Sequence, residues 1–390
     1  MNVKSNICPA PWYHMSTDTN GSIRPCCRYA QPHQQSEYKM PFMKDGNINQ
    51  IWNGEKFKKL RQAFIDNKKP KECEICWKEE ENNIRSYRQN LTDWFPYCFD
   101  NVNFDKNVAP PPTSFDFKVT NLCNMKCRIC GPTASSLFLE EAKQYTNIEY
   151  DPQYLQSNKI TQTSNREVFL NWLPHIRRIE ITGGEPLVSP ENKEMIELMV
   201  EKKEAHHIDL QITTNGKIFN EKFNENFKHF ERVILCLSID DIKERFEYQR
   251  YPSNWKKVKQ NIDSFFELDK NENIEVFIYC TVSNHNVFYL DEYCEYFSYL
   301  NDNKYNFGLL HHNDYWSIQN LHPYAKQLLI DKLYDINKLQ SVVDFLRGKS
   351  DNDLTHRFLH ECKRFDRLRN QNFKITFPEW YEILSMCSTI

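Results

Sequence analysis

Three closely spaced cysteines are the residues of this 390-residue chain whose types and spacing are best suited to chemistry. Cys123, Cys127 and Cys130 form a C-x3-C-x2-C run directly after a strand-like stretch at residues 115–119. Three thiolates this close can reach one small metal cluster, and a cubane iron–sulfur cluster has four irons that normally take four cysteines. Three local ligands leave one iron open, and an open coordination position on a metal is typical of catalytic chemistry.

Other candidate site residues stand where later strand-like stretches end. Two glycines in a row let the backbone approach a ligand closely and adopt positive φ. A downstream arginine suits a carboxylate because a guanidinium offers paired donors. Taken singly, these positions also fit ordinary turns, helix caps and a surface ion pair. They are Gly183, Gly184, Glu185 and Pro186 after residues 178–182, Thr214 and Asn215 around the end of 208–213, Ser238 and Asp240 around the end of 233–239, and Arg250.

The cysteine run and the Gly-Gly-Glu-Pro segment, at successive strand ends, together resemble the radical S-adenosylmethionine (radical SAM) enzymes. In that family the three cysteines hold a [4Fe–4S] cluster, and the amino and carboxylate groups of SAM chelate the fourth iron. An electron from the cluster cleaves SAM to methionine and a 5′-deoxyadenosyl radical, which abstracts hydrogen from a substrate. Ile129 departs from the pattern, because the residue before the last cysteine is usually aromatic.

The resemblance also implies roles for the residues at the strand ends. Residues 183–186 would meet the methionine amino group, Ser238 would contact the ribose or carboxylate of SAM, and Arg250 would pair with the carboxylate. Thr214, Asn215 and Asp240 lie in segments that look like the family's Thr-Asn-Gly and Ser-x-Asp motifs. A zinc site or a structural cluster is the alternative for the three cysteines.

A second cysteine set occupies the N-terminal part of the chain. Asn20-Gly21 predicts a two-residue hairpin turn that brings the strand after Cys8 alongside the strand ending at Cys26. With Cys73 and Cys76, this part resembles the auxiliary-cluster module called SPASM, or twitch when shortened, over residues 8 to 77 and on through Ser86-Tyr-Arg88. The resemblance implies a second [4Fe–4S] cluster on Cys8, Cys26, Cys73 and Cys76, with Cys27 as an alternative to Cys26. A four-cysteine zinc site is the competing interpretation.

Strand and helix signals alternate between these motifs. Six apolar stretches at 115–119, 178–182, 208–213, 233–239, 274–282 and 305–310 predict parallel strands buried on both faces, with helices between them. The fold class is therefore α/β, a partial (β/α)6 TIM-like barrel with ligands at the C-terminal strand ends. We expect an N-terminal cysteine-rich hairpin and helix module at 1–96, a linker at 97–114, the barrel at 115–320 and a C-terminal helical extension at 321–390 without a chemical signal.

Composition narrows the class of protein and its partners. Hydrophobic residues make up 40% of the chain and the formal net charge is −3, which disfavours nucleic acid as a partner. No apolar run has membrane-spanning length and the N-terminus lacks a signal-peptide core, so we expect a cytoplasmic protein without a membrane partner. Fourteen cysteines suit metal ligation in a reducing compartment.

The expected function is radical SAM chemistry on a substrate, with a peptide or protein favoured (crosslinking, oxidation or epimerisation) because many relatives with such modules act on peptides. A flavodoxin or ferredoxin would supply electrons. Cys280, near the end of the fifth strand, is a candidate hydrogen donor at the barrel mouth, and His311 and His312 end the sixth strand. The alternatives are a sugar or alcohol dehydrogenase, a nucleic-acid modifier, and a non-catalytic metal-binding interaction protein.

Overall fold

The computed structural model describes the chain as two compact units. Its described residues are 6–29, 40–43, 46–81, 85–94, 96, 103–144, 164–310, 314–348 and 352–388. The first unit contains Met1–Leu122, Ile148–Thr213 and Asn220–Ile234, and the second contains Cys123–Asn147, Thr214–Phe219 and Leu235–Ile390. Within the described residues, no helix combines the length and the apolar character needed to cross a membrane.

A mostly parallel, open sheet carries the candidate site residues, with strand order β2-β1-β3-β4-β5-β6-β7-β8. Neighbouring strands pair in parallel from β3 to β5 and between β7 and β8. All six predicted strands form within two residues of their expected bounds, and the sheet stays open, as a partial barrel requires. The strands are β1 (His14–Thr17), β2 (Ile23–Arg24), β3 (Ser114–Phe117), β4 (Arg178–Ile181), β5 (Asp209–Thr214), β6 (Arg232–Ser238), β7 (Ile274–Val282) and β8 (Tyr305–Leu309).

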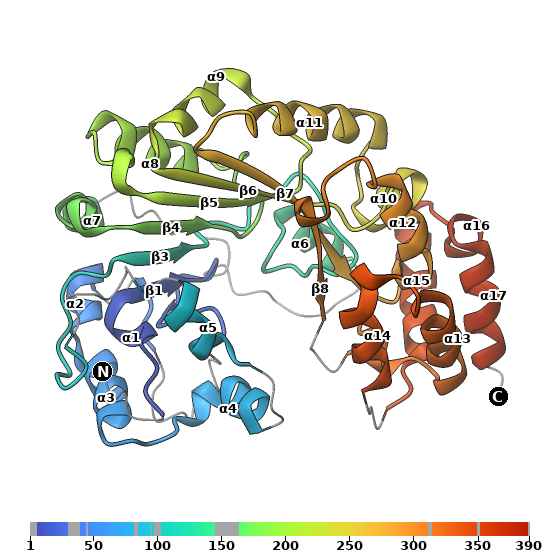
Figure 1. Cartoon of the computed structure of the whole chain (residues 1–390), viewed down its shortest axis with the longest axis horizontal. Helices are drawn as coiled ribbons and strands as arrows, with labels where there is room; N and C mark the ends of the chain where they lie inside the picture. The colour runs from blue at the N-terminus through green and yellow to red at the C-terminus, as the bar shows by residue number, and fades with distance from the viewer. Residues whose placement is uncertain are drawn as a thin grey trace. The chain divides into compact units, whose positions relative to one another are not determined.

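The predicted N-terminal hairpin forms and becomes part of the sheet. β1 pairs with β2 antiparallel and with β3 in parallel, so it lies beside β3 in Figure 1. The turn is longer than the predicted two residues: Gly21 N donates to Asp18 O, and Gly21 takes a left-handed φ of +83° after that turn. A turn followed by a left-handed glycine is the common three- to five-residue hairpin connection.

Burial differs between the strands: β3 is buried on both faces, as predicted, whereas β5, β6 and β7 alternate. In β5 every second residue is buried, and β7 follows the same rule over most of its length. In the first unit the apolar face of the sheet packs on α7 (Ser164–Trp172), where Phe115 contacts Trp172 and Phe117 contacts Phe169. The other face carries polar side chains, which are buried in β3 and only half-buried in β5.

Helices surround the sheet in each unit. In the first unit they are α1 (Ala10–Tyr13), α2 (Ile48–Trp52), α3 (Glu55–Ile65), α4 (Glu74–Glu81), α5 (Tyr87–Trp94), α7, α8 (Pro190–Glu201) and α9 (Glu221–Asn224). α8 begins as predicted, with Ser189 as N-cap and Pro190 at the first helical position.

The second unit contains the remaining helices, of which α13 to α17 form the orange-to-red group of Figure 1. This group lies within residues 321–390, where the sequence predicts helices. The helices of the second unit are α6 (Ser136–Ala142), α10 (Lys243–Gln249), α11 (Trp255–Leu268), α12 (Leu290–Tyr296), α13 (Pro323–Leu333), α14 (Gln340–Arg347), α15 (Thr355–Arg369), α16 (Phe373–Thr376) and α17 (Pro378–Cys387).

A buried arginine holds the N-terminal segments together. Arg61 of α3 is fully buried and donates to Pro11 O at 2.7 Å, Trp52 O at 2.9 Å and Asn107 O at 3.2 Å. Its guanidinium also lies 4.5 Å from the centre of the Trp52 ring. Burial lowers the pKa of Arg61 to about 9. One side chain thus satisfies three carbonyls from three separate segments.

Replacing Arg61 by methionine is expected to destabilise the first unit by about 3 kcal/mol, because buried carbonyls without a donor are costly. The measurement is urea unfolding of the full chain. Arg166→Met is the matched control, since Arg166 is an exposed helical arginine of the same unit that pairs with Glu194 at 3.0 Å. It should lose about 0–1 kcal/mol. Equal losses in the two variants would contradict the assigned role of Arg61.

Candidate functional site

The cysteine loop, residues 123–130, lies between β3 and α6 and is held by backbone hydrogen bonds to the segment after α10. Lys126 N donates to Tyr251 O at 2.6 Å, and Arg128 N donates to Gln249 O at 2.9 Å. The two donors are two residues apart, and so are the two acceptors, and the two segments run antiparallel. The residue between 249 and 251 therefore stands opposite the middle cysteine.

That residue is Arg250, whose Nη1 lies 4.0 Å from Cys127 Sγ. Its Nε donates to Asp240 Oδ2 at 2.8 Å, and both members of this ion pair are buried. Burial alone lowers the pKa of Arg250, but Asp240 and Cys127 raise it more, so the guanidinium keeps its charge. A hydrogen bond from Cys130 lowers the pKa of Cys127, and Arg250 acts in the same direction. A fixed cation beside a thiol favours the thiolate, which is the form that binds metal.

A second cation reaches the cysteine loop from the turn after β5. Lys217 Nζ donates to Asn124 O at 2.9 Å, and the nearby charges of Cys123 and Cys127 partly offset the burial that lowers the pKa of Lys217. Asn215, a predicted SAM contact, donates through Nδ2 to Asn124 Oδ1 at 2.8 Å. The Thr-Asn-Gly turn therefore supports the loop that carries the cysteines.

The double glycine packs against the residues that lead into the cysteine loop. Gly183 and Gly184 both have left-handed φ values, +77° and +53°. A Cβ on Gly184 would lie 2.4 Å from Leu122 O, and one on Gly183 would lie 2.8 Å from Lys118 Cβ. Glu185 N donates to Leu122 O at 2.8 Å. Only glycine allows this close approach, and it fixes the backbone immediately before the first cysteine.

The other predicted SAM contacts have local partners. Thr214 Oγ1 accepts from Gly216 N at 3.3 Å, which is turn chemistry, and Pro186 O accepts from Asn192 Nδ2 at 3.4 Å. Ser238 is half-buried at the end of β6. Residues 183–186 belong to the first unit, and Thr214 and Ser238 belong to the second. Their contacts with SAM stay predictions.

Asp240 and Cys280 both have protein partners. The Asp240 carboxylate accepts from Arg250 and from Thr281 N, at 3.0 Å, and its contact with SAM stays a prediction. Cys280 is completely buried, and its thiol donates to Asp240 O at 3.3 Å. It stands on the face of β7 opposite to exposed Tyr279. This placement gives no support to Cys280 as a hydrogen donor at a mouth. His311 and His312 lie outside the described residues.

The four predicted auxiliary ligands line one cavity of the first unit. Cys8, Cys26, Cys73 and Cys76 share its wall with Tyr29, Trp77, Tyr87 and two arginines. Burial raises the pKa of Cys8 to about 12, although the backbone N–H of Ala10 lowers it. Burial likewise raises the pKa of Cys76, against a backbone N–H from Arg88. N–H donors aimed at sulfur together with an apolar wall suit thiolates that a metal cluster neutralises.

Cys26 and Cys27, which the sequence left as alternatives, have different surroundings. Cys26 is buried on the cavity wall, whereas Cys27 is exposed and does not line the cavity. Arg88 closes another side of the wall: it forms a two-point ion pair with Glu80, donates to Ile7 O at 3.0 Å and lies 4.8 Å from the Trp77 ring centre. The geometry favours Cys26 as the fourth ligand.

The two cysteine sets fit iron–sulfur clusters by their donor chemistry. The first set offers three thiols beside two cations, and the second offers four thiols around one cavity. Among the residues that the structure describes, no three His, Cys, Asp or Glu side chains are arranged to hold a single metal ion. None of the described cysteines forms a disulfide, so the thiols are available as ligands.

Several residues of this region were not predicted from the sequence. Lys217 belongs to no recognised motif, and the helix α15 residues that bind the cysteine loop came from the segment expected to lack a chemical signal. A polar network on the sheet of the first unit was missed as well. There Asp116 accepts from Ser16 at 2.9 Å, and Arg178 binds Glu180 at 3.1 Å. Its signal is the alternation of polar residues in β3 and β4, which was readable.

Two family models match the chain, one for each cysteine set. The iron–sulfur cluster-binding SPASM domain matches residues 8–77, and the radical SAM superfamily matches residues 117–281. The chain is therefore a radical SAM protein with an N-terminal SPASM module. Its radical SAM domain implies a [4Fe–4S] cluster and SAM, and its SPASM module implies further iron–sulfur binding.

The chain is similar to curated proteins over part of its length. It is 26% identical over 171 residues to molybdenum cofactor biosynthesis protein 1 of Dictyostelium discoideum, covering 44% of this chain and 24% of that protein. It is 26% identical over 156 residues to a probable GTP 3′,8-cyclase of Methanococcus maripaludis, covering 40% of this chain and 46% of that protein. The chain thus spans less than half the length of these two relatives.

Two solved structures show a limited likeness. One is anSMEcpe with bound AdoMet, at 19% identity and a TM-score of 0.41, over 67% of this chain and 65% of that chain. The other is Streptococcus suis SuiB bound to precursor peptide SuiA, at 13% identity and a TM-score of 0.37, over 69% and 60%. At these TM-scores the likeness carries no argument about substrate.

Replacing Cys26 by serine is expected to remove the auxiliary cluster, whereas Cys27→Ser should leave it intact. After anaerobic reconstitution, the parent protein and Cys27→Ser should hold about eight irons per chain, twice four, and Cys26→Ser about four. Iron and zinc analysis checks this. About four irons with one zinc in the parent protein would mean that the module binds zinc. Iron loss only in Cys27→Ser would mean that Cys27, and not Cys26, is the fourth ligand of the auxiliary cluster.

Proposed function

We propose that this protein is a catalytic radical SAM enzyme that cleaves SAM reductively and abstracts hydrogen from a peptide or protein substrate. The chemistry that a bound [4Fe–4S] cluster supplies is one electron for the sulfonium of SAM, which yields methionine and a 5′-deoxyadenosyl radical. The chain's own residues bind and orient the reactants and set the local charge. The proposal rests on the two family matches and on the geometry of the cysteine loop.

One observation carries the proposal: Cys127 stands in a loop whose partner segment places a buried, charged Arg250 4.0 Å from its sulfur. The loop supplies three cysteines, so only Cys123 and Cys130 accompany Cys127. A purely structural cluster site does not need a buried cation beside such a thiol. Lys217 adds a second positive charge near Cys123 and Cys127. Such charges would stabilise thiolate ligands and an anionic group of SAM alike.

The proposed substrate class follows from the module and from the polar sheet face. Relatives that combine a SPASM module with a barrel are rich in peptide-modifying enzymes. In the first unit, buried Arg178 pairs with the partly exposed Glu180 on one face of the sheet, and burial raises the pKa of Glu180. A partly exposed carboxyl group suits the amide N–H and cationic groups of a peptide.

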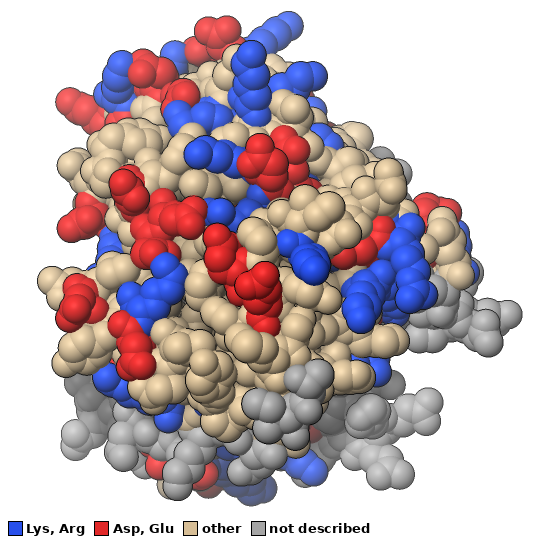
Figure 2. Space-filling view, turned by 90° about the vertical axis from the view of Figure 1, so that its right-hand side faces the viewer, with Lys and Arg blue, Asp and Glu red and all other residues tan. Residues whose placement is uncertain are grey.

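A nucleotide is the second candidate substrate, because several curated relatives that match part of the chain carry the name GTP 3′,8-cyclase. Extended nucleic acid is disfavoured by charge. The formal net charge is −3, and Figure 2 shows acidic and basic side chains interspersed on the face it draws. A flavodoxin or ferredoxin is the proposed electron donor.

Anaerobically reconstituted protein, given SAM and a strong reductant, is expected to form 5′-deoxyadenosine. Cys127→Ala should abolish this product, since two thiolates cannot hold the cluster. Cys387→Ser is the matched control, because Cys387 ends α17 and should leave the rate unchanged. The product is measured by chromatography and mass spectrometry. Absence of 5′-deoxyadenosine from iron-replete protein, or its full retention in Cys127→Ala, would overturn the proposed function.

Substrate class is tested by incubating the protein with SAM and deuterated candidates. A peptide library, GTP and a panel of small sugars and alcohols form the arms. Transfer of deuterium into 5′-deoxyadenosine identifies the substrate and the carbon attacked. Transfer from the peptide arm is expected, and transfer from GTP alone would replace the peptide by a nucleotide.

A further inference from the structure

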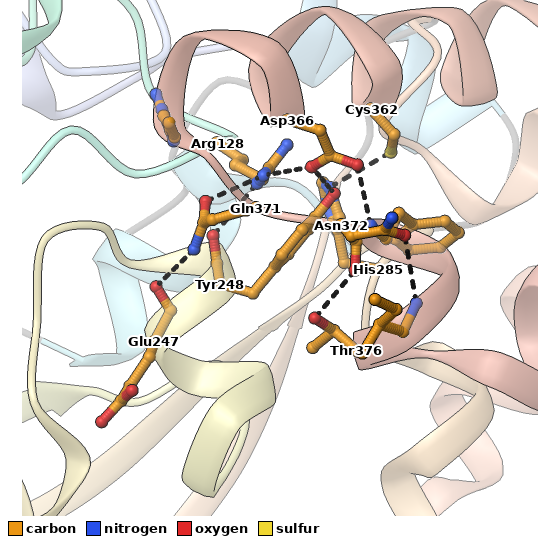
Figure 3. A network of polar contacts seen from close by, with 12 residues as sticks. Arg128, Glu247, Tyr248, His285, Cys362, Asp366, Gln371, Asn372 and Thr376 are labelled. Atoms are coloured by element: carbon orange, nitrogen blue, oxygen red, sulfur yellow. Dashed lines mark hydrogen bonds and ion pairs between the residues drawn. The ribbon is translucent and has the colours of Figure 1, made fainter.

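Helix α15, in the C-terminal part of the chain, binds the cysteine loop through Arg128, the residue after the middle cysteine. Arg128 is completely buried, and its Nη2 donates to Asp366 Oδ1 at 2.8 Å and to Gln371 Oε1 at 2.9 Å. Its Nε donates to Tyr248 O at 3.0 Å, and its guanidinium lies 3.5 Å from the Tyr248 ring centre. Figure 3 shows these side chains converging from the loop, α10 and the end of α15.

Asp366 is itself fixed by two further donors. Tyr248 OH donates to Asp366 Oδ1 at 2.8 Å, and Phe373 N donates to Oδ2 at 2.7 Å. Gln371 Nε2 donates to Glu247 O at 3.4 Å, as Figure 3 also shows. Every oxygen of the Asp366 carboxylate is therefore bonded, and Arg128 meets a preorganised acceptor.

A second contact holds the residue on the other side of Cys127. Lys126 Nζ pairs with Glu141 of α6 at 2.6 Å. Arg369, in the last turn of α15, donates to the same carboxylate through Nε and Nη2, at 3.1 Å and 2.7 Å. Arg369 and Glu141 are both buried. α15 thus binds the loop on both sides of one candidate cluster ligand, directly at Arg128 and through Glu141 at Lys126.

These buried ion pairs destabilise the folded protein if one of the partners is missing. Buried charges lose their hydration, and an arginine left without its carboxylate is strongly unfavourable. These pairs therefore favour the loop conformation in which Arg128 contacts Asp366 of α15 directly and Lys126 is linked to α15 through Glu141. Because these residues flank Cys127, that conformation also fixes the Cys127 thiol relative to Arg250.

We propose that α15 positions the radical SAM cluster: Asp366, Gln371 and Arg369 are positioning residues that act through Arg128, Lys126 and Glu141 on the three cysteine ligands. The inference rests on the proposed function for its catalytic meaning. It extends the cluster-binding structure to a helix that lies beyond residues 117–281, the part matched by the radical SAM family model. Replacing a residue that orients a metal ligand without binding the metal itself typically lowers metal affinity or activity about 10- to 100-fold.

The test compares two carboxylates of the same helix, the half-buried Asp366 and the buried Glu361. Asp366→Asn removes a charge that contacts the cysteine loop. Glu361→Gln removes a charge whose ion pairs, within the part of the chain that the structure describes, are with Arg357, His360 and Arg364 of α15 itself. Both full-length variants are reconstituted anaerobically. The readouts are iron content, the electron paramagnetic resonance spectrum of the reduced cluster with and without SAM, SAM affinity and 5′-deoxyadenosine formation.

Asp366→Asn is expected to alter the SAM-dependent spectrum and to weaken SAM binding or turnover about 10- to 100-fold, while Glu361→Gln stays like the parent protein. Gln371→Ala, an uncharged and milder change, should shift the spectrum in the same direction and serves if Asp366→Asn does not fold. Unchanged spectra and affinity in both Asp366→Asn and Gln371→Ala, or an equal change in Glu361→Gln, would overturn the proposal. A parent protein that binds both clusters but makes no 5′-deoxyadenosine would refute the proposed function, while the spectra would still decide the positioning role.

Discussion

Backbone pairing between the cysteine loop and the segment after α10 is the interaction on which the rest of the site depends. Two hydrogen bonds, from Lys126 and Arg128, leave Cys127 facing Arg250. Other parts of the second unit's site support this pairing or orient the Arg250 guanidinium that it places beside Cys127. Asp240 orients Arg250, and the turn after β5 supports the loop from another side.

The two cysteine sets solve the problem of buried thiolates in different ways. In the second unit, fixed cations compensate the negative charge, and the three-cysteine set leaves a coordination position for a ligand. In the first unit, Cys8 and Cys76 receive backbone N–H donors in a cavity walled by aromatic rings, and four thiols complete the set. The first arrangement suits reaction with SAM, and the second suits electron transfer or structural support.

The C-terminal helices change the view of which residues make up the site. Arg128 and Lys126 look like ordinary surface cations in the sequence, yet Arg128 is buried and pairs with α15, and Lys126 is linked to α15 through Glu141. Buried ion pairs of this kind add little net stability, because desolvation offsets much of their attraction, but removing one partner is strongly destabilising. Their effect is to select one conformation of the loop.

The sequence alone determined the chemistry, because ligand spacing and strand periodicity are local properties. Three cysteines within one loop, the double glycine and the six apolar stretches could be read without the fold, and the family matches confirm the class. Tertiary structure decided the contacts between segments that are distant in the sequence. These are the pairing of β1 with β3, the position of the Arg250 charge beside Cys127, and the hydrogen bond between Arg128 and Asp366 of α15. Arg128 and Asp366 are 238 residues apart, and no local pattern encodes a contact between such distant residues.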